Sequence, residues 1–296
     1  KQAAAAASYP GVRHVFLMPD THLGFGVPIG SVIVSDDTMI QSGSGYDISC
    51  GVLLMHVPEL LAEHVADPAR REAWIHEVEK RVATGLGVNR PVKMPSFSSH
   101  DVVEMMLHGA AFLGADPDTC ERVAMEVDPI AFDPKRIETA WRRAGLQLGS
   151  LGGGNHFVEM QIDPRDSSVW LMVHTGSRGF GHGTAEHYFY AGAELRGLAP
   201  NRRMESWLSL DEALGREFWA HHNAAANYAI CNRHVIARSV SDATAEVFQA
   251  EGVTYYEISH NLLQRERIYL PDGSLFEGFV HRKGATRAFP RLHPDL

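Results

Sequence analysis

Residues 42–52 read SGSGYDISCGV, a turn rich in glycine and serine that leads into the apolar, β-branched stretch GVLLMHV. The turn sets the carboxylate of Asp47 three residues before the thiol of Cys50. A carboxylate and a thiolate at this spacing can hold one metal ion. A turn aspartate followed by a buried cysteine gives the same pattern, so the rest of the chain has to decide between the two.

The composition is that of a globular protein without a disulfide framework. The chain has 296 residues, and 45% of them are hydrophobic, which is enough for a full core. Three cysteines make no framework of disulfides, and free thiols are typical of the reducing cytosol, so we expect a cytoplasmic protein. No run reaches the roughly 18 apolar residues of a membrane span. The net charge of −9 argues against a broad basic face, so a nucleic acid would be held locally, at a strand end for example.

Strand and helix patterns mix without a steady βαβ alternation. This favours an α+β fold with mixed or antiparallel sheets, and the lack of linkers and repeats favours one compact domain over residues 1–296. The stretch HVFLMPDTHLG predicts a short buried strand that ends at Pro19. Helical spacing is predicted between Glu59 and Arg81. A capping box, Ser209 with Glu212, predicts the start of a long helix.

Glycine-rich turns are predicted after two further strands. LGSLGGGNHFVEMQID reads as a turn that feeds a strand, and SSVWLMVHTGSRGFGHG as a strand that runs into a turn. In a regular strand Asn155 and Glu159 would share a face and His156 would point to the other. We therefore expect the chain still to be curling at His156, or a bulge to re-aim one of the three. A hairpin is predicted around Asp272 and Gly273.

Four strand-like segments end in polar turns beside glycine or other polar residues, and these turns carry possible metal ligands. They supply one carboxylate, one thiolate and three imidazoles, from Asp47, Cys50, His156, His174 and His260. Any one of these turns is more typical of structural residues, but four in one chain favour a metal site. The set is large enough for two ions if the thiolate bridges them. The softness of the thiolate and imidazole ligands alone would favour zinc or copper over manganese.

Two features could hold phosphate. Glycine-rich turns can aim several backbone N–H groups at one point, and Arg178 adds a fork that fits phosphate oxygens. Near the end of the chain a basic cluster gathers Arg282, Lys283, Arg287 and Arg291. For the glycine-rich turns, the alternative to a phosphate site is two tight turns with a solvated arginine. For the basic cluster, the alternatives are a solvated basic face and an anionic substrate site.

Six ordered segments carry a family resemblance: MPDTHLGFG, GYDISCGV, GSLGGGNHFVE, VHTGSRGFG, EISHN and HRKGATRA. Together they resemble the RtcB family of RNA-splicing ligases, over about residues 15–289. The resemblance implies an α+β fold around a deep pocket with two Mn²⁺ ions, and a GTP-dependent enzyme. Such an enzyme joins an RNA with a 2′,3′-cyclic phosphate or 3′-phosphate to one with a 5′-hydroxyl, through a guanylylated histidine and an RNA 3′ end activated by GMP.

The resemblance also implies roles for individual residues. One metal would be held by Asp47, Cys50 and His156. The other would be held by Cys50, His174 and His260, with the Cys50 thiolate as bridge.

Further roles concern the nucleotide and the phosphates. The residues implied to contact the guanylate or its phosphates are Asn155, Glu159 and Asn261. Arg178 and Lys283 would contact phosphate, and Asp20 would orient the nucleophilic histidine. RNA ends are the expected partners together with an archease-like activator, and a monomer is the default expectation.

One motif of the family has no counterpart here. The family places its nucleophilic histidine in an HGAGR-like motif downstream of HRKGATRA, whereas this sequence ends in RLHPDL. His281 and His293 lack the right neighbours. We therefore expect the sequence to lack the family's C-terminal segment.

Two other functions fit the same residues. A GTP-independent, metal-dependent phosphoesterase acting on cyclic or terminal phosphates needs the same metals and no covalent histidine. Transfer of GMP to a 3′-phosphate without joining, or binding of RNA ends without turnover, are further alternatives. GTP dependence and the joining of ends separate them.

Overall fold

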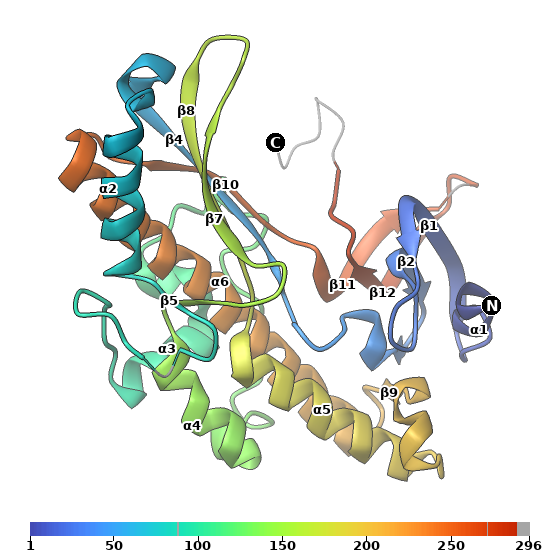
Figure 1. Cartoon of the computed structure of the whole chain (residues 1–296). Helices are drawn as coiled ribbons and strands as arrows, with labels where there is room; N and C mark the ends of the chain where they lie inside the picture. Colours follow the sequence, from blue (N-terminus) through green and yellow to red (C-terminus); the bar gives the residue numbers. More distant parts are fainter. Residues whose placement is uncertain (88, 271, 289–296) are drawn as a thin grey trace. The chain divides into compact units, whose positions relative to one another are not determined.

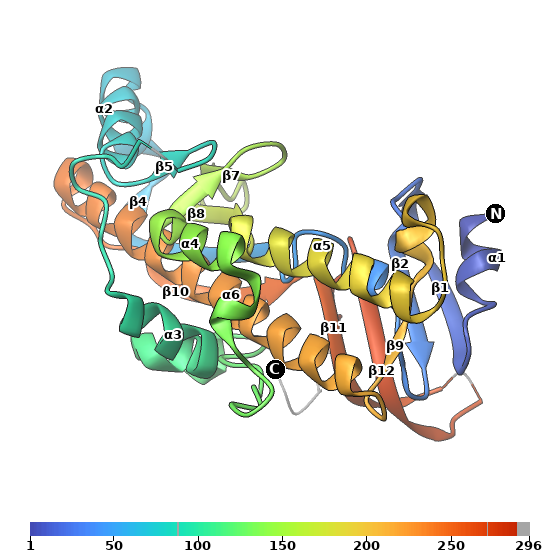
Figure 2. The same ribbon diagram turned by 90° about the horizontal axis from the view of Figure 1, so that it is seen from below.

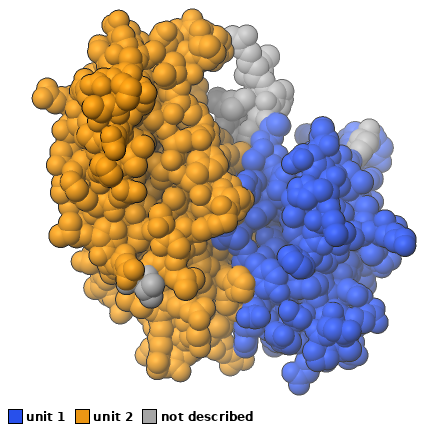
Figure 3. All heavy atoms as spheres, in the orientation of Figure 1, with its two compact units in different colours: residues 1–47, 185–219, 259–296 blue, residues 48–184, 220–258 orange. Residues whose placement is uncertain are grey.

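The computed structural model describes residues 1–87, 89–270 and 272–288 (Figure 1). Its internal contacts divide the chain into two compact units (Figure 3). Unit 1 contains Lys1–Asp47, Ala185–Trp219 and the described residues from Ser259 on; unit 2 contains the described residues of Ile48–Thr184 and Ala220–Ile258. Helices and antiparallel sheets occur in the same chain, so the predicted α+β class is confirmed.

Unit 1 is built on a four-stranded sheet with the order β1-β2-β12-β11, seen from below in Figure 2. Its neighbouring strands are antiparallel. The strands are β1 (Val12–His22), β2 (Ile29–Ser35), β11 (Asn261–Tyr269) and β12 (Leu275–Lys283). The hairpin predicted around Asp272 and Gly273 joins β11 to β12. The unit also holds α1 (Gln2–Ala6), η1 (Gln41–Gly43), η6 (Pro200–Glu205) and the pair β3 (Thr38–Met39) with β9 (Leu208–Ser209).

The first strand differs from its prediction. β1 continues through Pro19 to His22, and its residues are half-buried or exposed in place of a buried run. Proline removes a backbone donor, which an edge strand tolerates because one side of it has no partner in the sheet. β1 is at the edge of its sheet, and its register with β2 is interrupted between Leu17 and His22.

Unit 2 is built on a second four-stranded sheet, with the order β10-β4-β8-β7. The strands are β4 (Gly51–Leu61), β7 (Phe157–Ile162), β8 (Ser168–Thr175) and β10 (Val253–Ser259). Alternate residues of β4 and β8 point to one face, where α2 (Pro68–Glu79) and α6 (Ala213–Phe248) cover them (Figure 1). The buried side chains include Leu53, Met55, Val57, Val169, Leu171, Val173, Ile236 and Val240.

Smaller elements complete unit 2. They are η2 (Ala62–Val65), the parallel pair β5 (Ala83–Thr84) and β6 (Ser150–Gly152), α3 (Ser99–His108), η3 (Gly109–Leu113), η4 (Pro117–Thr119), η5 (Pro134–Ile137) and α4 (Glu138–Gln147). The helix predicted from Glu59 begins later, because β4 runs to Leu61. Asp67 caps α2 by accepting a hydrogen bond from the Ala69 N–H at 3.0 Å.

Two helices contribute residues to both units. α6 begins after the predicted capping box, where Glu212 Oε2 accepts a hydrogen bond from the Ser209 N–H at 3.0 Å. α5 (Arg178–Leu195) takes up most of the second glycine-rich turn that was predicted, so the turn after β8 is limited to Gly176 and Ser177. The glycines of its first turns allow close packing: a Cβ on Gly183 would lie 2.7 Å from Cβ of Ala140. Among the described residues, no helix has the length and apolarity that a membrane span requires.

Candidate metal centre

Three of the predicted ligands come together in unit 2, and we call them the thiol–imidazole cluster: Cys50, His156 and His174. The Cys50 Sγ atom lies 3.3 Å from Nε2 of His156 and 3.3 Å from Nε2 of His174. Cys50 directly precedes β4 and His156 directly precedes β7, while His174 lies on β8 between those strands. The sheet register therefore brings the three side chains to the same end of the sheet.

The position of His156 agrees with the expectation that the chain is still curling there. His156 precedes β7, so it does not follow the alternation of that strand. Its Nδ1 atom lies 2.9 Å from the carbonyl oxygen of Leu151. Because a carbonyl can only accept, Nδ1 carries the proton and Nε2 presents its lone pair to the sulfur. Imidazoles that bind metals are commonly oriented in this way.

The cluster has the geometry of ligands to a shared ion. With the zinc–sulfur bond of about 2.3 Å and the zinc–nitrogen bond of about 2.05 Å as a guide, sulfur and nitrogen on one ion lie about 3.1–3.6 Å apart for bond angles of 90–109°. Both observed separations of 3.3 Å lie inside this range. Cys50 and His174 are buried, with 2% and 6% of their surface exposed. The donor set therefore fits a cation, and the position of Cys50 between two imidazoles fits a bridging thiolate.

Arg178 lies beside the cluster, at the first residue of α5. Its Nε donates to Ser150 Oγ at 3.2 Å, and its Nη2 donates to the Gly85 carbonyl at 2.7 Å. A Cβ on Gly152, which has φ +104°, would lie 2.2 Å from Arg178 Nη1 and 2.8 Å from His156 Nδ1. Only glycine therefore leaves room for both side chains at this position.

Two residues near His156 that were predicted to bind the nucleotide lie at the surface. Asn155 and Glu159 are both exposed. Glu159 pairs with Met172 of β8, two residues from His174, so its side chain is on the same face of the sheet as that histidine.

Arg233 is a positioning residue that the sequence analysis missed. It is fully buried on α6, and its Nε donates to Glu257 Oε1 at 2.6 Å. Its Nη1 donates to the backbone carbonyls of Ser49 and of Thr175, the latter at 3.1 Å. Ser49 precedes Cys50 and has a φ of +57°, an unfavourable value for a non-glycine residue. Arg233 thus supports the backbone next to Cys50 and next to His174. An arginine inside the apolar stretch AAANYAICNRHVIA was the available signal.

Unit 1 brings together a second group of predicted site residues, at the open end of the β11–β12 hairpin. Asn261 and Lys283 pair directly across the two strands. Asn261 Oδ1 accepts a hydrogen bond from the Gly284 N–H at 2.8 Å, and its Nδ2 donates to the Asp47 carbonyl at 3.5 Å. The His260 carbonyl accepts from the Ala285 N–H at 3.1 Å. Asp47, His260, Asn261 and Lys283 therefore belong to one local structure.

Lys283 is buried, and burial lowers its pKa to about 8. Its Nζ donates to the Phe25 carbonyl at 2.6 Å. Asp20 lies on β1, far from the hairpin residues in the sequence, and it is exposed. Its backbone carbonyl accepts a hydrogen bond from His22 Nδ1 at 2.8 Å.

Two interpretations were given for the C-terminal basic cluster, a solvated basic face and an anionic substrate site. The solvated face is wrong for Arg282 and Lys283. β12 lies between β2 and β11, and both side chains are buried. Arg282 forms an ion pair with Glu266, with Nη2 3.0 Å from Oε2. Arg287 is half-buried, whereas Arg291 and His293 lie outside the described residues.

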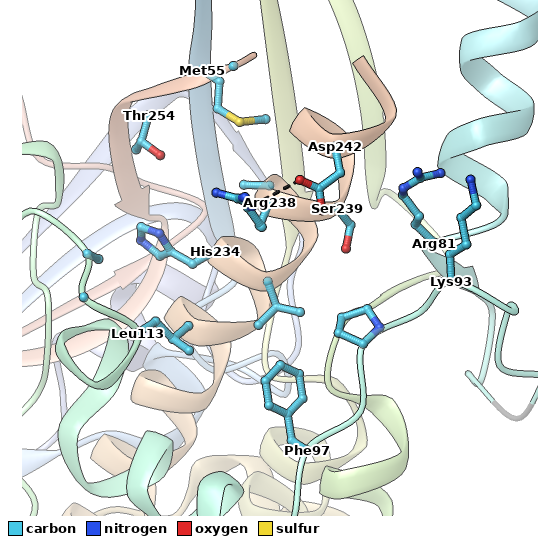
Figure 4. Close-up of a pocket in the computed structure, with 16 residues that line it drawn as sticks. Met55, Arg81, Lys93, Phe97, Leu113, His234, Arg238, Ser239, Asp242 and Thr254 are labelled. Atoms are coloured by element: carbon cyan, nitrogen blue, oxygen red, sulfur yellow. Dashed lines mark ion pairs between the residues drawn. The ribbon is translucent and has the colours of Figure 1, made fainter. Parts of the chain in front are cut away.

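A separate cavity of about 430 Å³ lies in unit 2 (Figure 4), and no member of the thiol–imidazole cluster lines it. Its cations are paired: Arg238 with Asp242 at 3.1 Å, and Arg81 and Lys93 with Glu246. The cavity therefore offers little uncompensated charge to a phosphate.

His234 lines the same cavity and lies 3.5 Å from the thiol of Cys120. Burial raises the pKa of Cys120 to about 11 and lowers that of His234 to about 4. Both groups are neutral at pH 7, so this pair is not an activated nucleophile.

Comparisons with known proteins agree with these features. A family model described as "tRNA-splicing ligase RtcB" matches residues 2–296. A tRNA-splicing ligase RtcB of Thermococcus kodakarensis is 32% identical over all of this chain and 66% of its own length. A second, from Aeropyrum pernix, is 31% identical with the same coverage. An RNA-splicing ligase RtcB of Mycobacterium tuberculosis is 32% identical over all of this chain and 73% of its own length.

A thiol shared by two imidazoles is a donor set that metal ions bind in proteins. The chain belongs to the RtcB family. It spans about two thirds of the length of the first relatives named above, 66% in each case.

Proposed function

We propose that the protein is an RNA ligase that joins an end with a 2′,3′-cyclic phosphate or 3′-phosphate to an end with a 5′-hydroxyl. One observation carries the proposal: in a chain of the RtcB family, the Cys50 thiol lies 3.3 Å from two imidazole nitrogens. A thiolate has lone pairs for two cations, and such cations would neutralise phosphate charge and polarise the attacked phosphorus.

The proposed ions are two Mn²⁺, and their ligand sets follow the family resemblance. Asp47, three residues from Cys50 in the sequence, would join His156 at one ion, and His260 would join His174 at the other. Arg178 and Lys283 would hold phosphate oxygens, while Asn155, Glu159 and Asn261 would hold the guanylate. Asp20 would orient the histidine that accepts the guanylate.

We further propose that joining depends on GTP. A protein histidine would attack the α-phosphorus of GTP and release pyrophosphate. The RNA 3′-phosphate would then take the GMP group from that histidine, and the 5′-hydroxyl would displace GMP as the new RNA bond forms. The HGAGR-like motif that carries this histidine in the family has no counterpart in the 296-residue sequence.

A joining assay tests the proposal with the protein expressed from its full reading frame. The substrates are one RNA with a 3′-phosphate and a second RNA with a 5′-hydroxyl, with or without GTP and Mn²⁺. We expect a longer RNA only when both are present. Cys50→Ala should lower the rate by about a hundredfold or more, since it removes a ligand shared by both sites. Cys231→Ala is the matched control, because that thiol is buried on α6 and lies 3.9 Å from the Met105 carbonyl.

Other outcomes would replace this function. Phosphate release or opening of the cyclic phosphate without GTP, and without joining, would indicate the phosphoesterase. Transfer of GMP to the 3′-phosphate with no joined product would indicate a capping enzyme. Equal rates for Cys50→Ala and wild type would contradict the role given to the thiol–imidazole cluster.

A further inference from the structure

The sheet of unit 2 has a second face, opposite the one covered by α2 and α6, and we call it the outer face. Residues of β4 and β8 alternate, so those between the buried core positions point to it. The outer face is rich in rings and large apolar side chains, which are Leu54, His56, Phe157, Trp170, Met172 and Tyr255. Tyr255 is 62% exposed, an unusual position for a large aromatic ring.

The rings of the outer face contact one another in a row. The ring centroids of His56 and Trp170 are 4.5 Å apart, and those of Trp170 and Tyr255 are 5.1 Å apart at 89°. Trp170 is also fixed at its edge, where Nε1 donates to Ser168 Oγ at 2.8 Å. Because these contacts already order the rings, a ligand that stacks on them loses little side-chain entropy.

The outer face is hollowed next to these rings. A cavity of about 530 Å³ is lined by Leu54, Gln161, Trp170 and Tyr255, and by Arg165 among others. Its volume is in the range of pockets that hold a small organic ligand, so a nucleobase with its sugar can enter. The Arg165 side chain is 87% exposed and is oriented by Asp163, whose carboxylate lies 2.6 Å from Nη2. A planar guanidinium beside aromatic rings can stack on a base or contact a phosphate.

The row of rings lies on the same face of the sheet as His174 of the thiol–imidazole cluster. His174 and Trp170 lie on the same strand and the same face, and Phe157 contacts the His174 ring edge to face at 5.2 Å. Four residues of strand span about 13 Å. At the rise of about 3.4 Å for stacked nucleotides, this distance corresponds to about four nucleotides, and fewer in an extended strand.

We propose that the outer face binds the single-stranded RNA next to the reacting end, with bases stacked on Trp170 and Tyr255. Aromatic side chains on a sheet accept bases of any sequence, because every base has a π-face. Stacking also suits a chain with a net charge of −9, which cannot rely on a broad cationic surface. This inference rests on the proposed function, because RNA is the occupant only if the cluster acts on RNA ends.

Binding of fluorescently labelled single-stranded RNA with a 3′-phosphate tests the proposal in the full protein. Trp170→Ala and Tyr255→Ala should each raise Kd between about fivefold and a hundredfold, the usual loss per stacked base. Trp170→Phe and Tyr255→Phe keep a stacking ring, so their Kd should stay within about threefold of wild type. Tyr269→Ala is the matched control, because that tyrosine is 79% exposed on β11 and should leave Kd unchanged.

Two results would overturn the stacking surface: unchanged Kd in both alanine variants, or equal losses in the alanine and phenylalanine variants. Failure of this proposal can be told from failure of the proposed function. If wild type joins RNA but the alanine variants bind RNA normally, the outer face is wrong and the ligase stands. If wild type joins nothing but Trp170→Ala weakens binding of single strands, the surface stands and the ligase does not.

Discussion

At the scale of single residues, Lys283 combines burial with a charge. Desolvation lowers its pKa from 10.5 to about 8, although its Nζ donates to the Phe25 carbonyl. Near pH 7 the ammonium is still charged and can meet a phosphate oxygen. The fold therefore keeps the Lys283 ammonium in a buried site that disfavours its charge, as is common for groups that bind ligands.

The pKa of Lys283 predicts a pH dependence of stability. Between pH 8 and 10.5 the unfolded chain binds a proton at this residue that the folded chain has lost, so the free energy of unfolding rises with pH in that window. Relative to Lys283→Met, the wild-type protein should gain up to about 3 kcal/mol from pH 7.5 to 10.5. Urea unfolding of both proteins at several pH values measures this. Parallel pH profiles would contradict the shift.

The sequence reveals some site residues better than others. Cys50, His156 and His174 stand in glycine-rich segments, so their chemistry is visible in the sequence, and the structure brings them together. Arg233 lies in a helix 184 residues from Ser49, and no local pattern shows that its guanidinium reaches that carbonyl. Side chains that act by supporting a distant backbone are the ones that sequence reasoning misses.

At the scale of elements, α6 is a buried helix with polar side chains that support loops. Asn227 accepts from the Met125 N–H at 2.6 Å and donates to the Met106 carbonyl at 2.9 Å. Asn232 accepts from the Gly149 N–H at 2.8 Å and donates to the Ser150 carbonyl at 3.1 Å. These bonds satisfy backbone groups that would otherwise be buried without partners. The long helix thus organises the irregular segments of unit 2.

The ion pair between Arg233 of α6 and Glu257 of β10 predicts how one single and one double variant behave. Burial raises the pKa of Glu257, and the Arg233 guanidinium opposes that effect. Arg233→Met leaves the carboxyl buried without its partner and should lower the free energy of unfolding by about 3–5 kcal/mol. Adding Glu257→Leu should recover most of this loss, whereas RNA joining should stay low because the Ser49 and Thr175 carbonyls have lost their donor.

Urea unfolding and the joining assay together check this pattern. Arg238→Met is the control, since that arginine is on the same helix with 76% of its side chain exposed, and its change should be below about 0.5 kcal/mol. Full recovery of joining in the double variant would show that Arg233 has no positioning role.

Elements were predicted best where apolar residues form a simple period. β4 and β8 were visible as apolar stretches, and α6 as a capped helix. The errors at Pro19 and at Arg178 have a common origin, because proline and glycine were taken as the ends of elements. An edge strand tolerates the proline, and close packing uses the glycines of α5. Those tertiary reasons are absent from a local pattern.

At the scale of the whole molecule, charge limits how the proposed RNA substrate can be held. The chain has a net charge of −9, and both Arg165 and Arg282 are paired with carboxylates. A negative net charge makes a broad electrostatic interface with RNA unfavourable. Binding should therefore depend on a few phosphates at the end of the strand and on stacked bases.

This balance predicts a weak dependence of RNA binding on salt. If about three phosphates are contacted, the slope of log K against log salt concentration should be near −2. Titration of labelled RNA between about 50 and 200 mM salt measures it. A slope steeper than about −5 would indicate a broad electrostatic interface and would contradict local binding.

The strand order of unit 1 has a consequence for synthesis on the ribosome. β2 is complete at Ser35, but its partner β12 begins only at Leu275, about 240 residues later. At roughly 5–20 residues per second, one edge of β2 waits about 12–50 s for its neighbour. During that interval the nascent β1–β2 hairpin presents unpaired backbone groups to other chains. We therefore expect newly synthesised protein to depend on chaperones, or on slow expression without crowding, far more than the folded protein does.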